Sequence, residues 1–281
     1  MTIINADASQ VYADLRIISA RPSREEEEQA PHRLFGTIDG AVACSAADWA
    51  KLAKAEIDEA TNASRLPVLV GGTGLYLRTL LDGIAPVPPI DPSVRKTVRA
   101  LPVEEAYSAL QTEDADATAR LGSQDSNRIA RALEVVRSTG KGLSRWQTEK
   151  TGGVADNFTV NGLLLLPPRD WLYARTDARF IKMAGAVGQA EVASLVARTL
   201  DPTLPIMRAI GVREIAAIIT DPDQASIHIA AGQQATRNYA KRQYTWFRNQ
   251  SPADWERNNA QLDAENINDL AIKLQQNTLT S

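Results

Sequence analysis

Residues 66–81 read LPVLVGGTGLYLRTLL, and this stretch decides the fold. Its first five residues are aliphatic apart from one proline, which is typical of a β-strand buried on both faces of a parallel sheet. The strand runs directly into Gly71–Gly74, and the leucine spacing that follows predicts a helix over residues 75–81. Strand, glycine turn and helix in this order indicate an α/β fold, which keeps ligands at the carboxyl ends of its strands.

The flanking segments extend this pattern on both sides. We expect a helix over residues 46–61 and a strand at Ile3–Ile4 that leads into a polar loop. Prolines cluster between residues 86 and 92, and residues 91–147 then have a helical pattern almost throughout. The sequence therefore predicts an α/β core formed by residues 1–90 and 156–281, which includes a basic C-terminal helix, and a helical insertion domain at residues 91–155.

Several element ends also carry local signals. Ser23 and Glu26 have capping-box spacing, so the acidic run after Ser23 is interpreted as the first turn of a helix. Asp125 or Ser126 is expected to cap a helix that ends near Gly140. Residues 158–166 are strand-like and residues 173–200 form a helical region interrupted by glycine. The polar tail from Gln250 onward is expected to be peripheral or frayed.

Charge is distributed unevenly along the chain. The formal net charge is -3 and the pI about 5.6, so any contact with nucleic acid must be confined to a local patch. Residues 237–248, RNYAKRQYTWFR, combine four cationic with four aromatic side chains and contain no acid. Cations neutralise phosphates, and aromatic rings stack on unpaired bases or anchor their helix to the core. This segment therefore favours a nucleic-acid contact.

The scarce residue types exclude several classes of protein. Cys44 is the single cysteine, which excludes an intramolecular disulfide. The histidines are His32 and His228, and so few ligands disfavour a structural zinc site or a Ser-His-Asp hydrolase. We expect no metal ligands among the side chains. The N-terminal segment has no basic leader, and the longest aliphatic run is Leu163–Leu166, so we expect a cytoplasmic protein without a membrane span.

Four polar residues are candidates for chemistry. Asp7 follows the first strand and is suited to accept a proton from a substrate, although aspartate is also a common turn residue. Thr73 could present its hydroxyl and amide to a phosphate, or simply belong to a tight turn. Arg208 and Arg213 flank a small apolar connection that could direct both toward an anion; surface ion pairing is the alternative.

Five segments resemble, in order, the successive motifs of the tRNA dimethylallyltransferases, also called tRNA isopentenyltransferases. They are NADASQVY, LPVLVGGTGLYLRTLL, DSNRIARALEVVRSTGK, LPIMRAIGVREI and YAKRQYTWFR. The resemblance implies transfer of a dimethylallyl group from its diphosphate to the exocyclic amine of the adenosine just 3′ of the anticodon. It also implies Mg²⁺ as the cofactor, dimethylallyl diphosphate and the tRNA anticodon stem-loop as partners, and a monomer.

The resemblance assigns roles to individual residues. Asp7 would be the general base, and Thr73 and Arg95 would line the reaction channel as catalytic residues. Thr73 and Arg208 would bind the diphosphate. The residues that would contact tRNA, whose target base must be flipped out of the anticodon stack, are Asp7, Ala8, Ser9, Gln10, Asn127, Arg128, Ile129, Ala130, Arg131, Arg208, Arg213, Lys241, Arg242, Gln243, Trp246 and Arg248.

One family motif does not occur in this chain. Family members begin with a strand, a G-x-x-x-x-G-K-[ST] phosphate loop and a helix before the segment NADASQVY. We therefore expect a phosphate-loop-transferase-like parallel sheet flanked by helices, without that first unit. The leading hypothesis is a tRNA dimethylallyltransferase whose recorded start omits the loop. The alternatives are a catalytically inactive tRNA-binding protein and a relative of small-molecule kinases.

Overall fold

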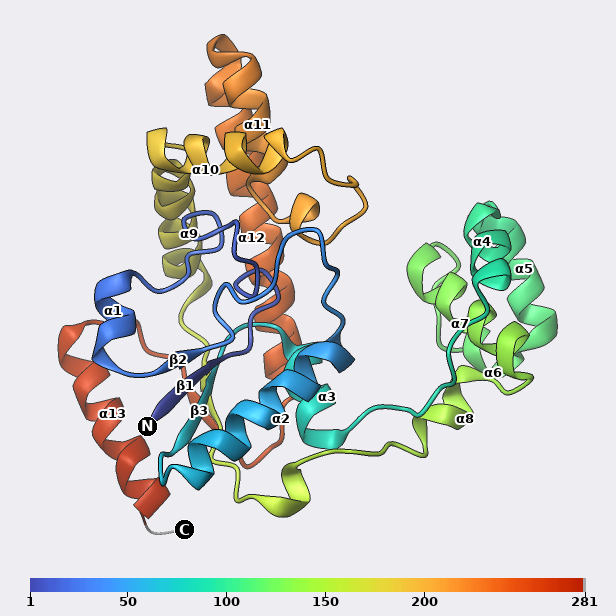
Figure 1. Cartoon of the computed structure of the whole chain (residues 1–281), viewed down its shortest axis with the longest axis horizontal. Coiled ribbons are helices and arrows are strands. Elements are labelled where there is room, and N and C mark those ends of the chain that lie inside the picture. The colour runs from blue at the N-terminus through green and yellow to red at the C-terminus, as the bar shows by residue number, and fades with distance from the viewer. Residues whose placement is uncertain (280–281) are drawn as a thin grey trace. The chain divides into compact units, whose positions relative to one another are not determined.

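A computed structural model describes residues 1–279 of the chain. The chain forms two compact units (Figure 1). Unit 1 consists of Met1–Arg78 and Ala155–Ser281, and unit 2 of Thr79–Val154. Unit 1 contains all the β-strands of the described residues, whereas unit 2 is helical. The expected α/β fold with a parallel sheet is confirmed.

Three parallel strands form the first sheet of unit 1, in the order β2-β1-β3. The strands are β1 (Thr2–Asn5), β2 (His32–Arg33) and β3 (Pro67–Val70). Helix α2 (Ala46–Asn62) packs on this sheet, where the indole Nε1 of buried Trp49 donates a hydrogen bond of 2.8 Å to the Asn5 carbonyl (Figure 1). In the parallel register Asn5 lies beside Val70, so the loops after β1 and β3 both leave from the carboxyl end of the sheet.

The expectation that β3 is buried on both faces was wrong. Its first three residues are half-buried and Val70 is 50% exposed. Within the described residues β3 pairs with β1 alone, so it is an edge strand. The aliphatic run identified the strand correctly but did not reveal how many neighbours cover it.

A second sheet pairs β4 (Leu163–Leu165) in parallel with β5 (Glu256–Asn258). β4 is shorter than the strand expected over residues 158–166. The tail is not frayed, because residues beyond Gln250 form β5 and helix α13 (Ala264–Leu279), although it contains no buried residue among those whose burial is described. The Trp255 ring occupies the space beside Gly162, within 2.0 Å of where a Cβ would lie. Backbone pairing and this contact hold a segment whose composition is polar.

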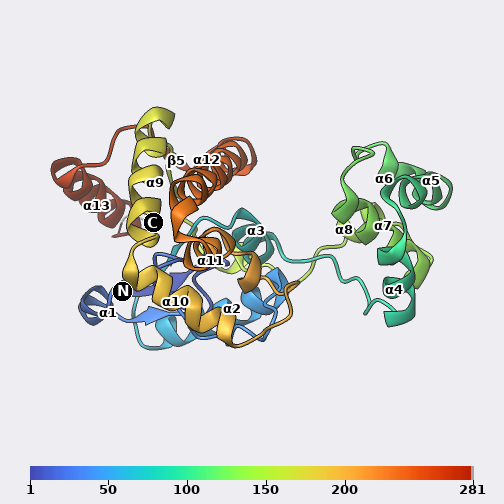
Figure 2. The same cartoon turned by 90° about the horizontal axis from the view of Figure 1, so that it is seen from above.

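Helices α9 to α12 of unit 1 pack on one another. α9 and α10 are separated at Gly185, which confirms the expected glycine interruption. α9 and α12 lie side by side, and the Phe180 ring packs so closely on Gly232 that a Cβ would lie 1.9 Å from it (Figure 2). The remaining helices of unit 1 are α1 (Arg24–Gln29), α3 (Gly74–Asp82), α9 (Arg169–Met183), α10 (Ala186–Ala197), α11 (Val212–Thr220) and α12 (Ala225–Gln250), with short 3₁₀ turns at η1 (Ala155–Asn157), η2 (Ile206–Arg208) and η3 (Pro222–Gln224).

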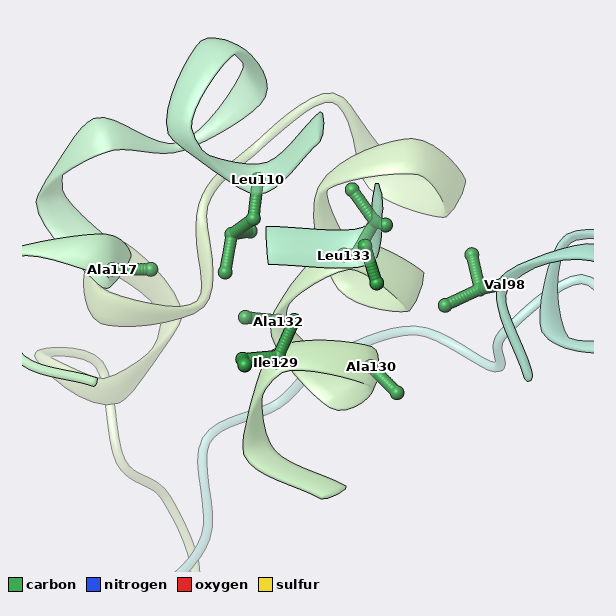
Figure 3. Packing of buried hydrophobic residues seen from close by; sticks show 8 residues of the cluster. Val98, Leu110, Ala117, Ile129, Ala130, Ala132 and Leu133 are labelled. Atoms are coloured by element: carbon green, nitrogen blue, oxygen red, sulfur yellow. The ribbon is translucent and has the colours of Figure 1, made fainter. Parts of the chain in front are cut away.

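Unit 2 has its own hydrophobic core, in which side chains from four helices meet (Figure 3). Its helices are α4 (Pro92–Ala100), α5 (Val103–Glu113), α6 (Ala115–Thr118), α7 (Ser126–Thr139) and α8 (Leu143–Gln147). The buried residues of this core are Val98, Ala106, Leu110, Ala117, Ile129, Ala130, Ala132 and Leu133.

The expected helix caps are confirmed. Ser23 and Glu26 form a reciprocal capping box at the start of α1. Asp125 caps α7 by accepting from the Arg128 amide, and α7 ends at Gly140 with a left-handed φ of 68°.

No single helix among residues 1–279 is long and apolar enough to span a membrane. Helices α9 and α10 reach the required length and composition only when they are taken together, and the pair is bent by 68°.

Candidate active site

The loops after β1 and β3 are joined by backbone and side-chain hydrogen bonds. The Ala6 amide donates to the Val70 carbonyl at 2.8 Å, and the Thr73 amide donates to the Ala6 carbonyl at 3.1 Å. The Thr73 hydroxyl oxygen accepts from the Ala8 amide at 2.9 Å. Asp7 lies between the two residues held in this way, so the structure brings Asp7 and Thr73 together. We call these two segments, residues 6–10 and 71–74, the loop pair.

The Asp7 carboxylate is held through one of its two oxygens. Oδ1 accepts from the Ser9 amide at 2.9 Å and from the Ser9 hydroxyl at 2.5 Å. The Asp7 amide in turn donates to the Asn5 side-chain oxygen at 2.8 Å. No hydrogen bond to Oδ2 is recorded among the described residues, and this oxygen lies on the side of Gly72. All donors to this carboxylate are neutral, so the second oxygen is left to accept a proton.

Helix α12 packs directly on the glycine turn. The Gln243 side-chain amide donates to the Gly72 carbonyl at 2.9 Å. A Cβ at Gly72 would lie 2.1 Å from the Gln243 nitrogen, and a Cβ at Gly74 would lie 2.2 Å from the Trp246 ring. Glycine is needed at Gly74 because the Trp246 ring cannot move aside easily, whereas at Gly72 a Cβ would displace only the flexible end of the Gln243 side chain. The arrangement explains why Gln243 and Trp246 occur one turn apart on the basic helix.

Tyr239 is part of this site, although the sequence indicated it only as one of the four aromatic side chains of the basic segment. Burial raises the pKa of its phenol, and the negative charge of Asp7 raises it further. Hydrogen bonds with Thr73 and Gln243 and the positive charge of Arg242 lower the pKa by less. The phenol therefore stays protonated at neutral pH beside the loop pair. Its spacing of four residues from Gln243 and seven from Trp246 places all three on one helical face, which is the signal that could have found it.

Arg179 on α9 is a residue that sequence reasoning missed. Partial desolvation lowers the pKa of its guanidinium, and the charge of Asp7 opposes that shift. The side chain remains exposed, and the structure records no hydrogen bond or ion pair for it within residues 1–279. An uncommitted cation therefore lies close enough to Asp7 to sense its charge. No local signal marks Arg179, because only the packing of α9 in unit 1 brings it there.

An aromatic cluster lies beside the loop pair on the side of α2. The Trp49 and Tyr76 rings stack with centroids 4.5 Å apart. Burial raises the pKa of Tyr76, with smaller contributions from Cys44, Tyr12 and Asp7 in the same direction. Burial likewise raises the pKa of Cys44 and that of Tyr12. These groups are neutral at ordinary pH, and all except the half-buried Cys44 are buried, so they form uncharged core packing near Asp7.

The aromatic residues of α12 anchor the helix. The Tyr244 hydroxyl donates to the Leu166 carbonyl at 3.3 Å, and the Arg169 guanidinium lies 5.1 Å from the Tyr244 ring centroid. Arg237 pairs with Asp177 of α9 at 2.6 Å, so the acid that is missing from the basic segment is supplied by another helix. The sequence had predicted four uncompensated cations here. Those that remain exposed are Lys241, Arg242 and Arg248.

Arg208 and Arg213 lie at the ends of a tight connection in unit 1. Arg208 ends η2 and Arg213 lies in the first turn of α11, and both are exposed. Gly211 between them has a left-handed φ of 101°, which favours glycine, and its amide donates to Glu214 at 3.0 Å. Neither arginine has a recorded salt bridge in residues 1–279, and neither has a recorded hydrogen bond to the loop pair there.

The other expected site residues belong to unit 2. Arg95 on α4 is 57% exposed, and Asn127 and Arg128 are exposed in the first turn of α7. Ile129 is 0% and Ala130 8% exposed, and both side chains belong to the hydrophobic core. The prediction of side-chain contact with RNA in this segment therefore remains only for Asn127, Arg128 and the half-buried Arg131.

A metal centre is not built into the described residues. No group of three or more His, Cys, Asp or Glu side chains that could hold a metal occurs in the part of the chain that the structure describes. At the loop pair Asp7 supplies one carboxylate, and Ser9 already occupies one of its oxygens. Mg²⁺ requires near-octahedral oxygen coordination. These residues therefore do not fit a resident Mg²⁺ by themselves.

Comparisons with known proteins identify the family. The sequence profile of the IPP transferase family matches residues 10–250. The tRNA dimethylallyltransferase of Erythrobacter litoralis is 60% identical over 255 residues, covering 91% of this chain and 80% of the relative. That of Sphingopyxis alaskensis is 56% identical over 279 residues, covering 99% of this chain and 91% of the relative.

Solved structures agree with this result. The tRNA isopentenylpyrophosphate transferase of Bacillus halodurans superimposes with a TM-score of 0.67 at 27% identity, covering 99% of this chain and 90% of that chain. A eukaryotic dimethylallyltransferase acting on tRNA has the same fold, with a TM-score of 0.75 at 24% identity over 88% of this chain and 63% of that chain. Profile, sequence relatives and fold agree, and the chain belongs to the IPP transferase family of prenyltransferases.

Proposed function

We propose that this protein transfers a dimethylallyl group from dimethylallyl diphosphate to the exocyclic amine of the adenosine just 3′ of the anticodon in tRNA. The observation that carries the proposal is the state of Asp7. One oxygen of its carboxylate is fixed by Ser9, and the other is left without a recorded hydrogen bond beside Thr73. A positioned, uncommitted carboxylate is what a neutral amine needs when it becomes a nucleophile.

The proposed transfer makes one bond and breaks one. The adenosine amine nitrogen attacks the terminal carbon of the dimethylallyl group, and the bond between that carbon and the diphosphate oxygen breaks. The amine proton passes to Oδ2 of Asp7, and the electron pair leaves with the diphosphate. We assign Thr73, whose hydroxyl oxygen accepts from the Ala8 amide, to the diphosphate, as the resemblance implies.

Positive charge is needed where the diphosphate leaves. Arg179 is exposed, has no recorded partner in residues 1–279, and interacts with the charge of Asp7. We assign it to the developing negative charge of the leaving group, together with Arg208 from the resemblance. Mg²⁺, which the resemblance implies, would be held with the help of the diphosphate oxygens, since the described residues contain no group of three or more side chains that could hold a metal.

The tRNA is proposed to bind through exposed cations and polar groups of both units. In unit 1 these are Lys241, Arg242, Arg248, Arg208 and Arg213. In unit 2 they are Asn127 and Arg128, together with the half-buried Arg131. Contacts to phosphate fix the register of the RNA, and the target base then leaves its stack. We expect the protein to act as a monomer in the cytoplasm, where its tRNA substrate is found.

The test is transfer of label. The chain is incubated with Mg²⁺, tRNA and dimethylallyl diphosphate labelled in the dimethylallyl group. Label is expected in tRNA that carries adenosine 3′ of the anticodon and not in a matched tRNA with guanosine there. Equal labelling of both tRNAs would contradict the proposed acceptor.

A second outcome distinguishes the inactive tRNA-binding alternative. Under this alternative the anticodon stem-loop binds in a gel-shift titration, but no label reaches the RNA at any enzyme concentration. Loss of both binding and labelling would refute the two functions together.

A further inference from the structure

A buried carboxylate lies at the contact between α4 and α7 of unit 2. The Glu134 side chain is 1% exposed. Its Oε1 accepts from the Arg99 Nε at 2.6 Å, and its Oε2 lies 3.9 Å from the Arg95 Nε. Arg131 is one turn before Glu134 on the same helix, close enough for their charges to interact. One acid is therefore surrounded by three guanidinium groups, which we call the arginine trio.

The two arginines of α4 are held by Glu134 but are not covered. Arg95 is 57% exposed and Arg99 is 51% exposed, although their partner is buried. Oε2 of Glu134 has no recorded hydrogen bond in the described residues. At 3.9 Å, Arg95 is attracted to this oxygen without donating to it. Its donors remain available to a ligand that approaches from solvent.

The charges of the trio are only partly compensated. Three cations surround one carboxylate, and no other acid is recorded within ion-pair distance of Arg95, Arg99 or Arg131 in the described residues. Burial lowers the pKa of Arg131; Glu134 opposes this shift, while Arg95 and Arg99 lower the pKa further. The cations thus repel one another across a short distance. Without Glu134, mutual repulsion would separate them.

We propose that Glu134 is a positioning residue that gathers Arg95, Arg99 and Arg131 into a single surface for the phosphate backbone of tRNA, with Arg99 as an additional RNA contact. The inference rests on the proposed function, since tRNA must be the ligand. Guanidinium groups bind phosphate oxygens in a fixed planar geometry. The affinity for RNA therefore depends on the orientation of the three arginines and not on their charge alone. A buried acid is well placed to fix that orientation because it takes up no exposed surface.

Two simpler readings make different predictions. If Glu134 only stabilises unit 2, removing its charge changes the unfolding temperature and leaves RNA affinity of the folded protein unchanged. If only net charge matters, removing an acid beside three cations strengthens RNA binding. The proposed positioning role predicts weaker binding despite the gain of positive charge. The sign of the change therefore separates the three readings.

The test compares Glu134→Gln with Glu113→Gln in the whole chain. Glu113 is a matched control because it pairs with Arg137 at 2.7 Å in the same unit and is outside the trio. Affinity for the anticodon stem-loop is measured by titration over a range of salt concentrations, below the unfolding temperature of each variant. We expect Glu134→Gln to weaken binding by roughly tenfold, the loss of about one hydrogen bond to a charged group. The control is expected to keep or slightly improve its affinity.

Two further variants keep the test decisive if Glu134→Gln folds poorly. Arg99→Gln removes a half-exposed side chain and is expected to lower the salt slope by about 1. Arg99→Lys keeps the charge but loses the planar fork, so its affinity should fall between those of Arg99→Gln and the unmodified chain. Unchanged or tighter binding by Glu134→Gln, or an unaltered slope for Arg99→Gln, would overturn the inference while leaving the proposed function in place. No tRNA binding by the unmodified chain would overturn both.

Discussion

Two carboxylates, Asp7 in unit 1 and Glu134 in unit 2, have opposite surroundings. Asp7 is half-buried at the end of a strand, and its hydrogen-bond donors are the neutral amide and hydroxyl of Ser9. Glu134 is buried in a helical unit, and its partners are cations. A carboxylate that is held through one oxygen by neutral donors keeps the other oxygen free for a substrate proton. One that is surrounded by arginines instead serves to orient them. The same functional group is thus suited to catalysis in one unit and to binding in the other.

The largest effect is expected from Asp7→Asn, which preserves shape and removes the base. We expect prenyl transfer to fall by about 10²- to 10⁴-fold, the usual contribution of a general base. Affinity for the anticodon stem-loop should change little, because the substitution leaves the exposed cations in place. Single-turnover transfer at saturating tRNA is the measurement. If Glu134→Gln lowered this saturated rate as much as Asp7→Asn did, the contrast between the two carboxylates would be lost.

The next effect concerns the cation that faces Asp7. Arg179→Gln is expected to slow transfer by about 10²-fold, because a preorganised charge near the leaving group is removed. tRNA affinity should be nearly unchanged. The matched control is Arg175→Gln, one turn earlier on α9, whose guanidinium lies 4.7 Å from the Trp171 ring centroid. Equal losses in the two variants would show that α9 contributes only general charge.

A smaller effect tests the close packing that shapes the loop pair. Gly74→Ala places a Cβ within 2.2 Å of the Trp246 ring, so either α12 or the turn must shift. We expect the free energy of unfolding to fall by about 1–3 kcal/mol, as for other overpacked sites. Gly122→Ala is the control, because a Cβ there meets no atom within 4 Å. Chemical denaturation measures both; similar stability of the two variants would argue against a tight contact at Gly74.

The smallest effects are expected from the exposed cations of the basic helix. Arg242→Ala or Arg248→Ala should weaken binding of tRNA and reduce the slope of affinity against salt by about 1. Lys51→Ala on α2 is the control, since this exposed lysine lies outside the proposed RNA contacts. Titrations at several salt concentrations give the slopes. A slope as steep as that of the unmodified chain would remove these side chains from the phosphate contacts.

Local signals predicted elements and their ends well. The capping box at Ser23, the Asp125 cap and the glycine end at residue 140 were all confirmed, because each depends on side chains a few residues apart. Predictions that depend on distant neighbours were less successful. β3 was expected to be buried but has an open edge in the described residues, and the polar tail, expected to be peripheral or frayed, forms β5 instead of fraying.

The sequence alone determined the family, the α/β class and the order of the motifs, because these follow from residue types at fixed spacing along the chain. Only the tertiary structure decided which groups meet. It placed Tyr239 and Arg179 near Asp7, paired Arg237 with Asp177, and buried Glu134 among arginines of two helices. The physical reason is that hydrogen bonds and ion pairs act over a few ångströms, whereas their partners here come from helices and strands far apart in the sequence.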